Sequence, residues 1–364
     1  MTALKLTIYF GERDRAGGRS AAEALGELFA RRGVLLAVLV RGIEGFGLKH
    51  RLQTHRILSL SEDLPLVWVA VDRPQLIESL AAEVDDLVPE GLVTLERARI
   101  LSEGGTPDAG ALDHPGGEDA KLTLYLGRGE RHRGRLAYLA LVDALREAGV
   151  EGASVLLGVD GVRDGERRRA RLLGPNSAVP VMVIAVGSRA RIARALAATR
   201  EIAPGRVATL ETARILKRDG VPRRPLRRPD PEDGAGLGVW QKIMVFTAED
   251  SRTEHGPLYV ELVRRLREAG VAGATALGGV WGYSGSGPPH GDRMLRLRRG
   301  VPVVVVSVDR PGRISAAWPM IDRLTARSGV VTGELVPAFR AHAPGARIGG
   351  LRLARILDEA EGAE

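Results

Sequence analysis

The chain has 364 residues, of which 44% are hydrophobic and 27% charged, with a formal net charge of +8. This composition is typical of a globular protein of two or three domains, and the lack of cysteine excludes disulfides, thiolate metal ligands and a cysteine nucleophile. Aromatic residues make up only 4%, which disfavours binding by base stacking. No apolar run approaches the ~18 residues of a membrane span and Met1–Phe10 lacks the layout of a signal peptide, so we expect a cytoplasmic protein.

The first third of the chain opens with a predicted strand, helix and strand. An alternating apolar run ends near Phe10. Apolar residues at helical spacing then predict a helix from about Ser20 to Arg32, which Gly33 ends. The apolar run Val34–Val40 predicts the second strand.

A polar, basic stretch, Arg41–Asp63, separates this half from a second half of the same kind. Leu64–Val71 predicts the third strand and Leu92–Leu101 the fourth. Between them, Asp72 can cap a second helix that has Pro74 in its first turn.

The same unit occurs three times, because equivalent strings recur at fixed offsets. Lys5–Tyr9 recurs as Lys121–Tyr125 and Lys242–Phe246, and Gly33 recurs as Gly149 and Gly270. Thr94–Leu101 recurs as Thr209–Leu216, and in the third copy Ala354–Leu357 resembles the end of this string after an insertion. We predict repeat 1 at residues 1–101, a linker at 102–118, repeat 2 at 119–217, a Pro/Arg-rich linker at 218–238, and repeat 3 with a C-terminal insertion at 239–364.

Two βαβ halves of this size predict a ferredoxin-like (βαββαβ) unit, with a four-stranded antiparallel sheet under two helices. The third strands of the later repeats, Val181–Val186 and Val303–Val306, are apolar on both faces, which is typical of strands buried on both sides. The predicted fold class is therefore α+β: three tandem ferredoxin-like domains whose open faces meet around one axis, forming an intramolecular pseudo-trimer.

A unit of this kind with a long loop between strands two and three resembles the PII signalling superfamily. Arg41–Gly47 and Ile57–Pro65 in the first repeat are similar to the PII-like family named domain of unknown function 190. Gly279–Tyr283 and Pro289–Arg293 carry the resemblance in the more divergent third repeat. The resemblance covers almost all of the chain outside the linkers and is weakest in the loop of the second repeat.

The resemblance implies a regulatory protein and not an enzyme. In such proteins an adenine nucleotide (ATP, ADP or AMP) binds as an effector between neighbouring units, no cofactor is required, and the long loop contacts a target. Genes of this family often lie beside fluoride channel genes, which suggests a fluoride channel or another transporter as the partner, by association alone. Because the three units are fused, we expect a monomeric pseudo-trimer.

Three glycine pairs at the start of the long loops are candidate phosphate-binding positions. Glycine permits positive φ and a close approach of backbone N–H groups to an anion; the alternative is a plain tight turn. The pairs are Gly42 and Gly45, Gly158 and Gly161, and Gly279 and Gly282.

Basic residues follow each glycine pair, and arginine suits bidentate contact with phosphate, although a solvated surface explains them equally well. The loop candidates are Arg51, Arg56, His290 and Arg293. Three aromatic residues beside the glycines either stack on an adenine ring or pack at the base of the loop; they are Phe46, Trp281 and Tyr283. The second repeat has Val162 at the position of Phe46.

Three of the five lysines occupy one repeat position: Lys5, Lys121 and Lys242. On the face expected to line the axis, they either extend to solvent or bind an anion. Four arginines predicted on the last strands are candidates for a neighbouring cleft or for a solvent-facing edge: Arg97, Arg99, Arg214 and Arg355.

The sequence predicts no catalytic residues and no metal site. It lacks a G-x-x-x-x-G-K-[ST] loop and a G-x-S-x-G elbow, and its seven histidines show no repeated ligand spacing. The alternatives are a basic RNA-binding protein on a ferredoxin-like scaffold and an oligomeric scaffold without a ligand. RNA is not favoured, because the third strands contain Trp68 in repeat 1 and no aromatic residue in the other repeats.

Overall fold

The computed structural model describes residues 1–47, 53–54, 63–101, 119–170, 176–291, 300–343 and 346–356. The first repeat contains β1 (Thr2–Gly11), β2 (Arg15–Ala16), β3 (Arg19–Ser20), α1 (Ala21–Arg31), β4 (Leu36–Phe46), β5 (Gln53–Thr54), β6 (Pro65–Asp72), α2 (Pro74–Leu87) and β7 (Gly91–Ile100). The second contains β8 (Asp119–Gly127), β9 (Arg131–His132), β10 (Arg135–Leu136), α3 (Ala137–Glu147), β11 (Gly152–Arg163), β12 (Glu166–Arg167), β13 (Pro180–Ser188), α4 (Arg189–Ile202), β14 (Ala208–Arg218) and β15 (Val221–Pro222).

The third repeat contains β16 (Trp240–Ala248), β17 (Arg252–Thr253), β18 (Gly256–Pro257), α5 (Leu258–Glu268), β19 (Ala274–Gly278), β20 (Trp281–Ser284), β21 (His290–Gly291), β22 (Pro302–Asp309), α6 (Pro311–Leu324), β23 (Val330–Val336), β24 (Ala338–Ala343) and β25 (Ala346–Gly350). Among the helices that the structure describes, none is both long and apolar enough to cross a membrane.

Local sequence explains most element boundaries, with one exception at α2. The helix begins at Pro74, whose fixed φ suits the first turn. The prediction that Asp72 caps this helix is wrong, because Arg73 occupies the N-cap position. The Asp72 carboxylate instead accepts the backbone N–H groups of Leu35 (2.7 Å) and Arg73 (2.6 Å), so it fixes the connection into β4.

The long strands form one closed sheet. In the first repeat they pair antiparallel in the order β4–β6–β1–β7. The outer strands then continue into other repeats, since β4 pairs with β11 and β19, and β14 pairs with both β7 and β23. Antiparallel pairings around the circuit β4–β19–β22–β16–β23–β14–β7–β1–β6 return to β4 and close a nine-stranded barrel.

The prediction of three tandem ferredoxin-like domains forming a pseudo-trimer is therefore wrong as a description of the fold. The long strands of the three repeats pair into one sheet and do not form three separate sheets, and helices account for much less of the chain than strands. The physical reason is that an unpaired strand edge leaves backbone N–H and C=O groups unsatisfied. Strand β4 extends to Phe46, six residues beyond the predicted end at Val40, because β19 of the third repeat supplies hydrogen-bonding partners.

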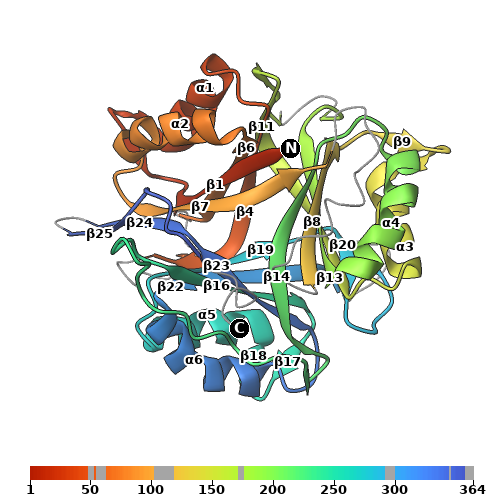
Figure 1. Cartoon of the computed structure of the whole chain (residues 1–364). Coiled ribbons are helices and arrows are strands. Elements are labelled where there is room, and N and C mark those ends of the chain that lie inside the picture. Colours follow the sequence, from red (N-terminus) through yellow and green to blue (C-terminus); the bar gives the residue numbers. More distant parts are fainter. Residues whose placement is uncertain are drawn as a thin grey trace.

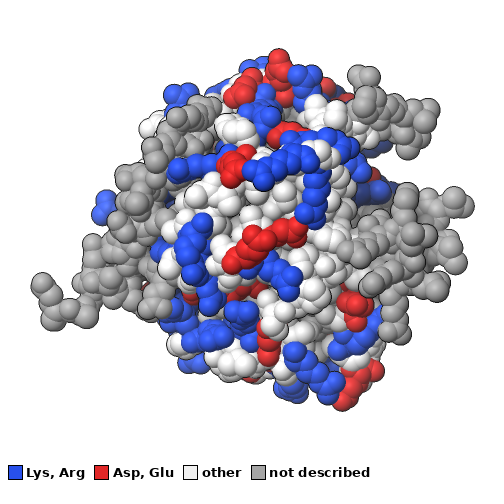
Figure 2. Space-filling model, turned by 90° about the vertical axis from the view of Figure 1, so that its right-hand side faces the viewer, with Lys and Arg blue, Asp and Glu red and all other residues white. Residues whose placement is uncertain are grey.

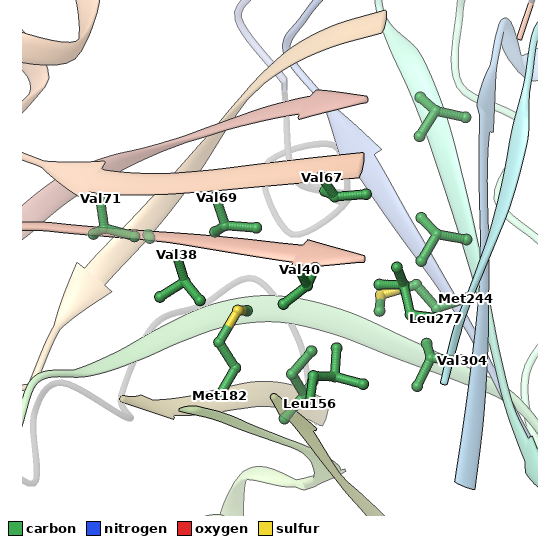
Figure 3. Close-up of a cluster of buried hydrophobic side chains, with 14 of the residues drawn as sticks. Val38, Val40, Val67, Val69, Val71, Leu156, Met182, Met244, Leu277 and Val304 are labelled. Carbon is green, nitrogen blue, oxygen red and sulfur yellow. The ribbon is translucent and has the colours of Figure 1, made fainter. Parts of the chain in front are cut away.

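Apolar side chains from all three repeats fill the interior of the barrel. Figure 3 shows Val38 and Val67 from the first repeat facing Met182 from the second and Met244 and Val304 from the third. The helices lie outside in three pairs, and each pair covers its own apolar cluster (Figure 1). Both faces of the strands are therefore buried, as the apolar third strands predicted.

The fourth strand of the third repeat differs from the prediction. The structure places it at β23, Val330–Val336, and not at the string Ala354–Leu357, whose described residues 354–356 form no strand. The segment between them forms the hairpin β24–β25, and β24 pairs antiparallel with β7 of the first repeat. The C-terminal insertion thus covers a strand edge of the first repeat.

Candidate functional site

The three equivalent lysines meet three buried glutamates inside the barrel and form an alternating ring, the lysine–glutamate ring. Each carboxylate is shared by two ammonium groups. The Nζ–Oε2 distances are 3.3 Å for Lys5 to Glu96, 3.1 Å for Lys121 to Glu211 and 2.8 Å for Lys242 to Glu334. Closer contacts join Lys5 to Glu211, Lys121 to Glu334 and Lys242 to Glu96. All six side chains are buried.

Charge pairing in the ring shifts the pKa of Glu96 and Glu334 down and the pKa of Lys121 and Lys242 up, and so favours the charged forms of these four groups. Burial alone would raise the pKa of Glu96, but the positive charges of Lys242 and Lys5 outweigh it and hold this pKa well below its usual range. Burial would likewise lower the pKa of Lys121, yet attraction to Glu211 and Glu334 raises it above the ordinary value. The ring is therefore a self-neutralising ionic cluster, and the predicted extension of the lysines to solvent is wrong.

Sequence reasoning missed the glutamates, although a signal for them was present. Glu96 and Glu211 lie in the recurring string Thr-Leu-Glu, two residues after Thr94 and Thr209. The third copy reads Thr332-Gly333-Glu334 and was overlooked because the last strand had been placed near Ala354. A correct alignment would have shown three glutamates at one repeat position, opposite the three lysines.

The ring predicts how stability depends on pH. The depressed pKa values of Glu96 and Glu334 contribute stability that is present above their unfolded value of about 4.3 and is lost as pH falls toward the folded values. The raised pKa values of Lys121 and Lys242 contribute stability that is present below about 10.4 and is lost as pH rises through the folded values. Urea midpoints should be flat near neutrality and fall at both extremes; a midpoint unchanged down to about pH 3 would contradict this assignment.

Five of the six predicted glycines lie within strands and Gly279 lies between β19 and β20; all six are at or beside places where strands of two repeats pair. Gly158 of β11 faces Val40 of β4, and a Cβ at Gly158 would lie 2.5 Å from the carbonyl oxygen of Pro180. At Gly42 a Cβ would lie 2.6 Å from Pro65 Cγ, and at Gly279 it would lie 2.7 Å from Pro302 Cγ. The other members occupy the same crossings: Gly45 on β4, Gly161 on β11 and Gly282 on β20.

The equivalent residues beside these glycines pack into a neighbouring repeat. Phe46 lies in the apolar cluster of the third repeat, Val162 in that of the first, and Tyr283 in that of the second. All three are buried, and the hydroxyl of Tyr283 donates to the carbonyl of Val150 at 3.0 Å. The structure places these side chains as interlocking contacts between repeats, away from solvent.

The basic loop candidates are mostly not described. Arg51, Arg56 and Arg293 lie outside the described residues. His290, on β21, is half-buried, and its Nδ1 lies 3.0 Å from the carbonyl oxygen of Pro288.

A cleft of about 610 Å³ lies at the base of the strand 2–strand 3 connection of the second repeat; we call it the loop-base cleft. Three arginines line it: Arg163, Arg168 and Arg206. Gly127, at the end of β8, and Gly129, just after it, bring backbone to another side of the cleft, and Leu36 contributes from the first repeat. The cleft therefore joins basic side chains and glycine backbone at a boundary between repeats.

The arginines of this cleft are paired with carboxylates of the same lining. Arg206 Nε lies 2.8 Å from Glu130, Arg163 Nε lies 3.6 Å from Asp164, and Arg168 pairs with Glu166. The side chains of Arg168 and Glu166 are 53% and 70% exposed. Exposed ion pairs contribute only ~0–1 kcal/mol to the stability of a protein, so an incoming anion can replace the Glu166 carboxylate at small cost.

A second pocket, of about 260 Å³, lies on the glutamate side of the lysine–glutamate ring and is called the mouth pocket. Its lining comes from all three repeats and from the linker before the third. Two of the four arginines predicted near a cleft, Arg97 and Arg214, line it. Arg355 lines a separate pocket with linker residues, and Arg99 lies on β7 opposite Leu210.

Comparisons with known proteins identify the repeated unit. The model of the family described as "Uncharacterized ACR", domain of unknown function 190, matches residues 3–100, 119–215 and 240–338. A protein of Aquifex aeolicus described as a UPF0166 protein is 33% identical over 72 residues, which cover 20% of this chain and 69% of that protein. The chain therefore belongs to the domain of unknown function 190 family and carries three copies of its unit.

Proposed function

We propose that this protein is a PII-like regulatory protein that binds an adenine nucleotide, or another phosphate-bearing anion, in the loop-base cleft. The observation that carries the proposal is the composition and place of this cleft. Its volume of about 610 Å³ falls within the ~300–1,000 Å³ typical of sites for ligands of this size. It lies at the base of the strand 2–strand 3 connection, where the family resemblance places the nucleotide.

The chemistry of the cleft suits phosphate. Guanidinium groups make bidentate, charge-assisted hydrogen bonds to phosphate oxygens, and Arg163, Arg168 and Arg206 reach the cleft from two connections of the second repeat. Backbone near Gly127 and Gly129 can approach an anion closely because no Cβ intervenes. Exchange of the exposed Arg168–Glu166 pair for a phosphate contact requires only that the Arg168 side chain turn, because both residues lie on or beside β12.

We propose that the cleft binds and does not catalyse. Its described lining contains no histidine, and Ser177 is its one hydroxyl-bearing side chain besides Tyr125. We further propose that the strand 2–strand 3 loops contact a protein target, such as a fluoride channel or another transporter. This part rests on the family resemblance.

RNA binding receives less support. RNA-recognition motifs present aromatic side chains on an open sheet face, whereas here both strand faces are covered, one by the helices and one by the barrel interior. On the face drawn in Figure 2, basic side chains are interspersed with acidic and uncharged ones and do not form one continuous basic surface. The net charge of +8 is therefore not concentrated on this face in a basic surface of the kind that binds nucleic acid.

Calorimetry on the purified chain tests the proposal. ATP, ADP, AMP, cyclic AMP and inorganic phosphate are titrated separately, with the solution mass measured in parallel. We expect a monomer that binds at least one nucleotide, with affinity reduced about tenfold or more in Arg206→Gln, because one charge-assisted hydrogen bond is lost. Arg31→Gln, which removes an exposed arginine at the end of α1, is the matched control and should bind as the unchanged chain does. No nucleotide binding, together with salt-sensitive RNA binding, would overturn the proposal.

A further inference from the structure

The mouth pocket contains buried hydrogen-bond acceptors for which the described residues supply no donor. Gln241 is 1% exposed; its Nε2 donates to the carbonyl of Arg227 at 3.2 Å, while its Oε1 has no partner within the described part of the chain. Glu211 and Glu334 each engage lysines through Oε2, and in both residues Oε1 is buried without a partner among the residues that the structure describes. A buried acceptor without a donor is destabilising, so these three oxygens mark a place for hydrogen-bond donors.

The other wall of the pocket is made of arginines. Arg97 donates to the carbonyl of Ala354 at 2.9 Å, and Arg224 Nε lies 3.2 Å from Asp119. Arg214 and Arg227 complete this wall. A guanidinium carries five N–H donors in a planar fork, so four of them provide a strong and directional site for a carboxylate.

The two walls together select the charge type of the ligand. A simple anion would be attracted by the positive charge of the arginines but would face the carboxylates of Glu211 and Glu334. A cation would satisfy the free carboxylate oxygens but would face the arginines and, behind the glutamates, three lysines. Carboxylate oxygens of Glu96, Glu211 and Glu334 do lie within 4.8 Å of one another, a spacing that could hold a metal ion. The lysine ammonium groups lie against the same carboxylates, so a bare metal ion would add positive charge without a counter-charge of its own, whereas a zwitterion brings its own carboxylate.

We propose that the mouth pocket binds a small zwitterion of the α-amino acid class. Its ammonium group donates to the unpartnered oxygens of Gln241, Glu211 and Glu334, and its carboxylate accepts from the arginine wall. The volume of about 260 Å³ lies below the ~300–1,000 Å³ typical of sites for drug-sized ligands and suits a smaller ligand such as one amino acid. Since residues of all three repeats contact this ligand, its binding stabilises the closed barrel.

The proposal is independent of the loop-base cleft. The two pockets share no lining residue, so their ligands can be tested separately on the same chain. Amino acid binding should be unaffected by Arg206→Gln, and nucleotide binding should be unaffected by changes in the mouth pocket. Failure of one proposal would therefore leave the other standing.

Thermal-shift screening of each proteinogenic amino acid, followed by calorimetry on those that raise the melting temperature, tests the proposal on the full chain. We expect at least one amino acid to bind with one-to-one stoichiometry. Acetate and methylammonium, which each carry one half of the zwitterion, should bind at least about tenfold more weakly, because each lacks one set of charge-assisted contacts.

Two variants locate the site. Arg214→Gln should weaken binding of the selected amino acid about tenfold or more, while Arg323→Gln, an exposed arginine at the end of α6, should leave it unchanged. Gln241→Met removes the unpartnered oxygen at similar size and should weaken binding while keeping the folded circular dichroism spectrum. The proposal is overturned if no amino acid binds, if acetate alone or a divalent metal ion alone binds as tightly, or if Arg214→Gln and Gln241→Met, both folded, bind normally.

Discussion

Replacing Glu211 with glutamine should lower the free energy of unfolding by about 3–5 kcal/mol, the usual cost of removing one partner from a buried ion pair. Glu211 is 4% exposed and its Oε2 contacts both Lys5 and Lys121, which belong to different repeats. Glutamine has the same shape, so packing is preserved while two buried ammonium groups lose a shared counter-charge. Equilibrium urea unfolding followed by circular dichroism measures the change.

An exposed ion pair provides the control for this experiment. Arg133 and Glu201 lie 2.7 Å apart, with side chains 79% and 62% exposed. Glu201→Gln should therefore change the unfolding free energy by no more than about 1 kcal/mol. A similarly small effect of Glu211→Gln would show that the lysine–glutamate ring does not stabilise the protein.

Replacing Gly158 with alanine should destabilise the protein by about 1–3 kcal/mol or more, as overpacking of a well-filled interior does. The new Cβ would lie 2.5 Å from the carbonyl oxygen of Pro180 and 3.0 Å from Val38 Cγ1. The backbone oxygen cannot move away without breaking the pairing of β11 with β13 and β4. Thermal and urea unfolding both report this effect.

Gly47→Ala is the matched control, because no atom of the residues that the structure describes lies within 4 Å of a Cβ at Gly47. It should unfold at nearly the same urea concentration as the unchanged chain. If Gly158→Ala kept full stability and instead lost nucleotide binding, the glycine pairs would be phosphate-binding positions, as their sequence spacing suggested, and the strand-crossing role assigned to them would fail.

The sequence predicted what is local within a repeat. The recurrence of Lys5 at Lys121 and Lys242 revealed three copies, and the helices and long strands of the first repeat lie close to where apolar spacing predicts them, except at the end of β4. The apolar third strands correctly predicted burial on both faces, because a strand without polar alternation has no face suited to water.

Contacts between repeats were beyond prediction from local patterns. The residues after Val40 look polar and glycine-rich, so they were expected to form a loop, yet they continue as a strand because β19 of the third repeat pairs with them. For the same reason Phe46 and Tyr283 appeared available to a ligand, whereas each fills the apolar cluster of another repeat. Strand pairing across more than 100 residues leaves no trace in a short window of sequence.

The candidate sites were predicted unevenly. Arg97 and Arg214 were expected near a cleft and do line the mouth pocket, because they lie on last strands that converge there. The loop-base cleft was expected only in outline, since its arginines lie close to the second glycine pair but Arg206 comes from the distant connection before β14. Whether Arg51, Arg56 and Arg293 contribute to phosphate binding stays a prediction.

The central claim is that the three repeats form one closed barrel with shared strands and a shared ionic ring. Hydrogen exchange, measured by mass spectrometry on the full chain at increasing urea concentrations, tests it most directly because it follows the amides of each repeat separately. We predict that amides of β1, β8 and β16 lose protection at the same urea midpoint, in one cooperative transition. Three separate midpoints, one for each repeat, would contradict the account and would restore three independent domains.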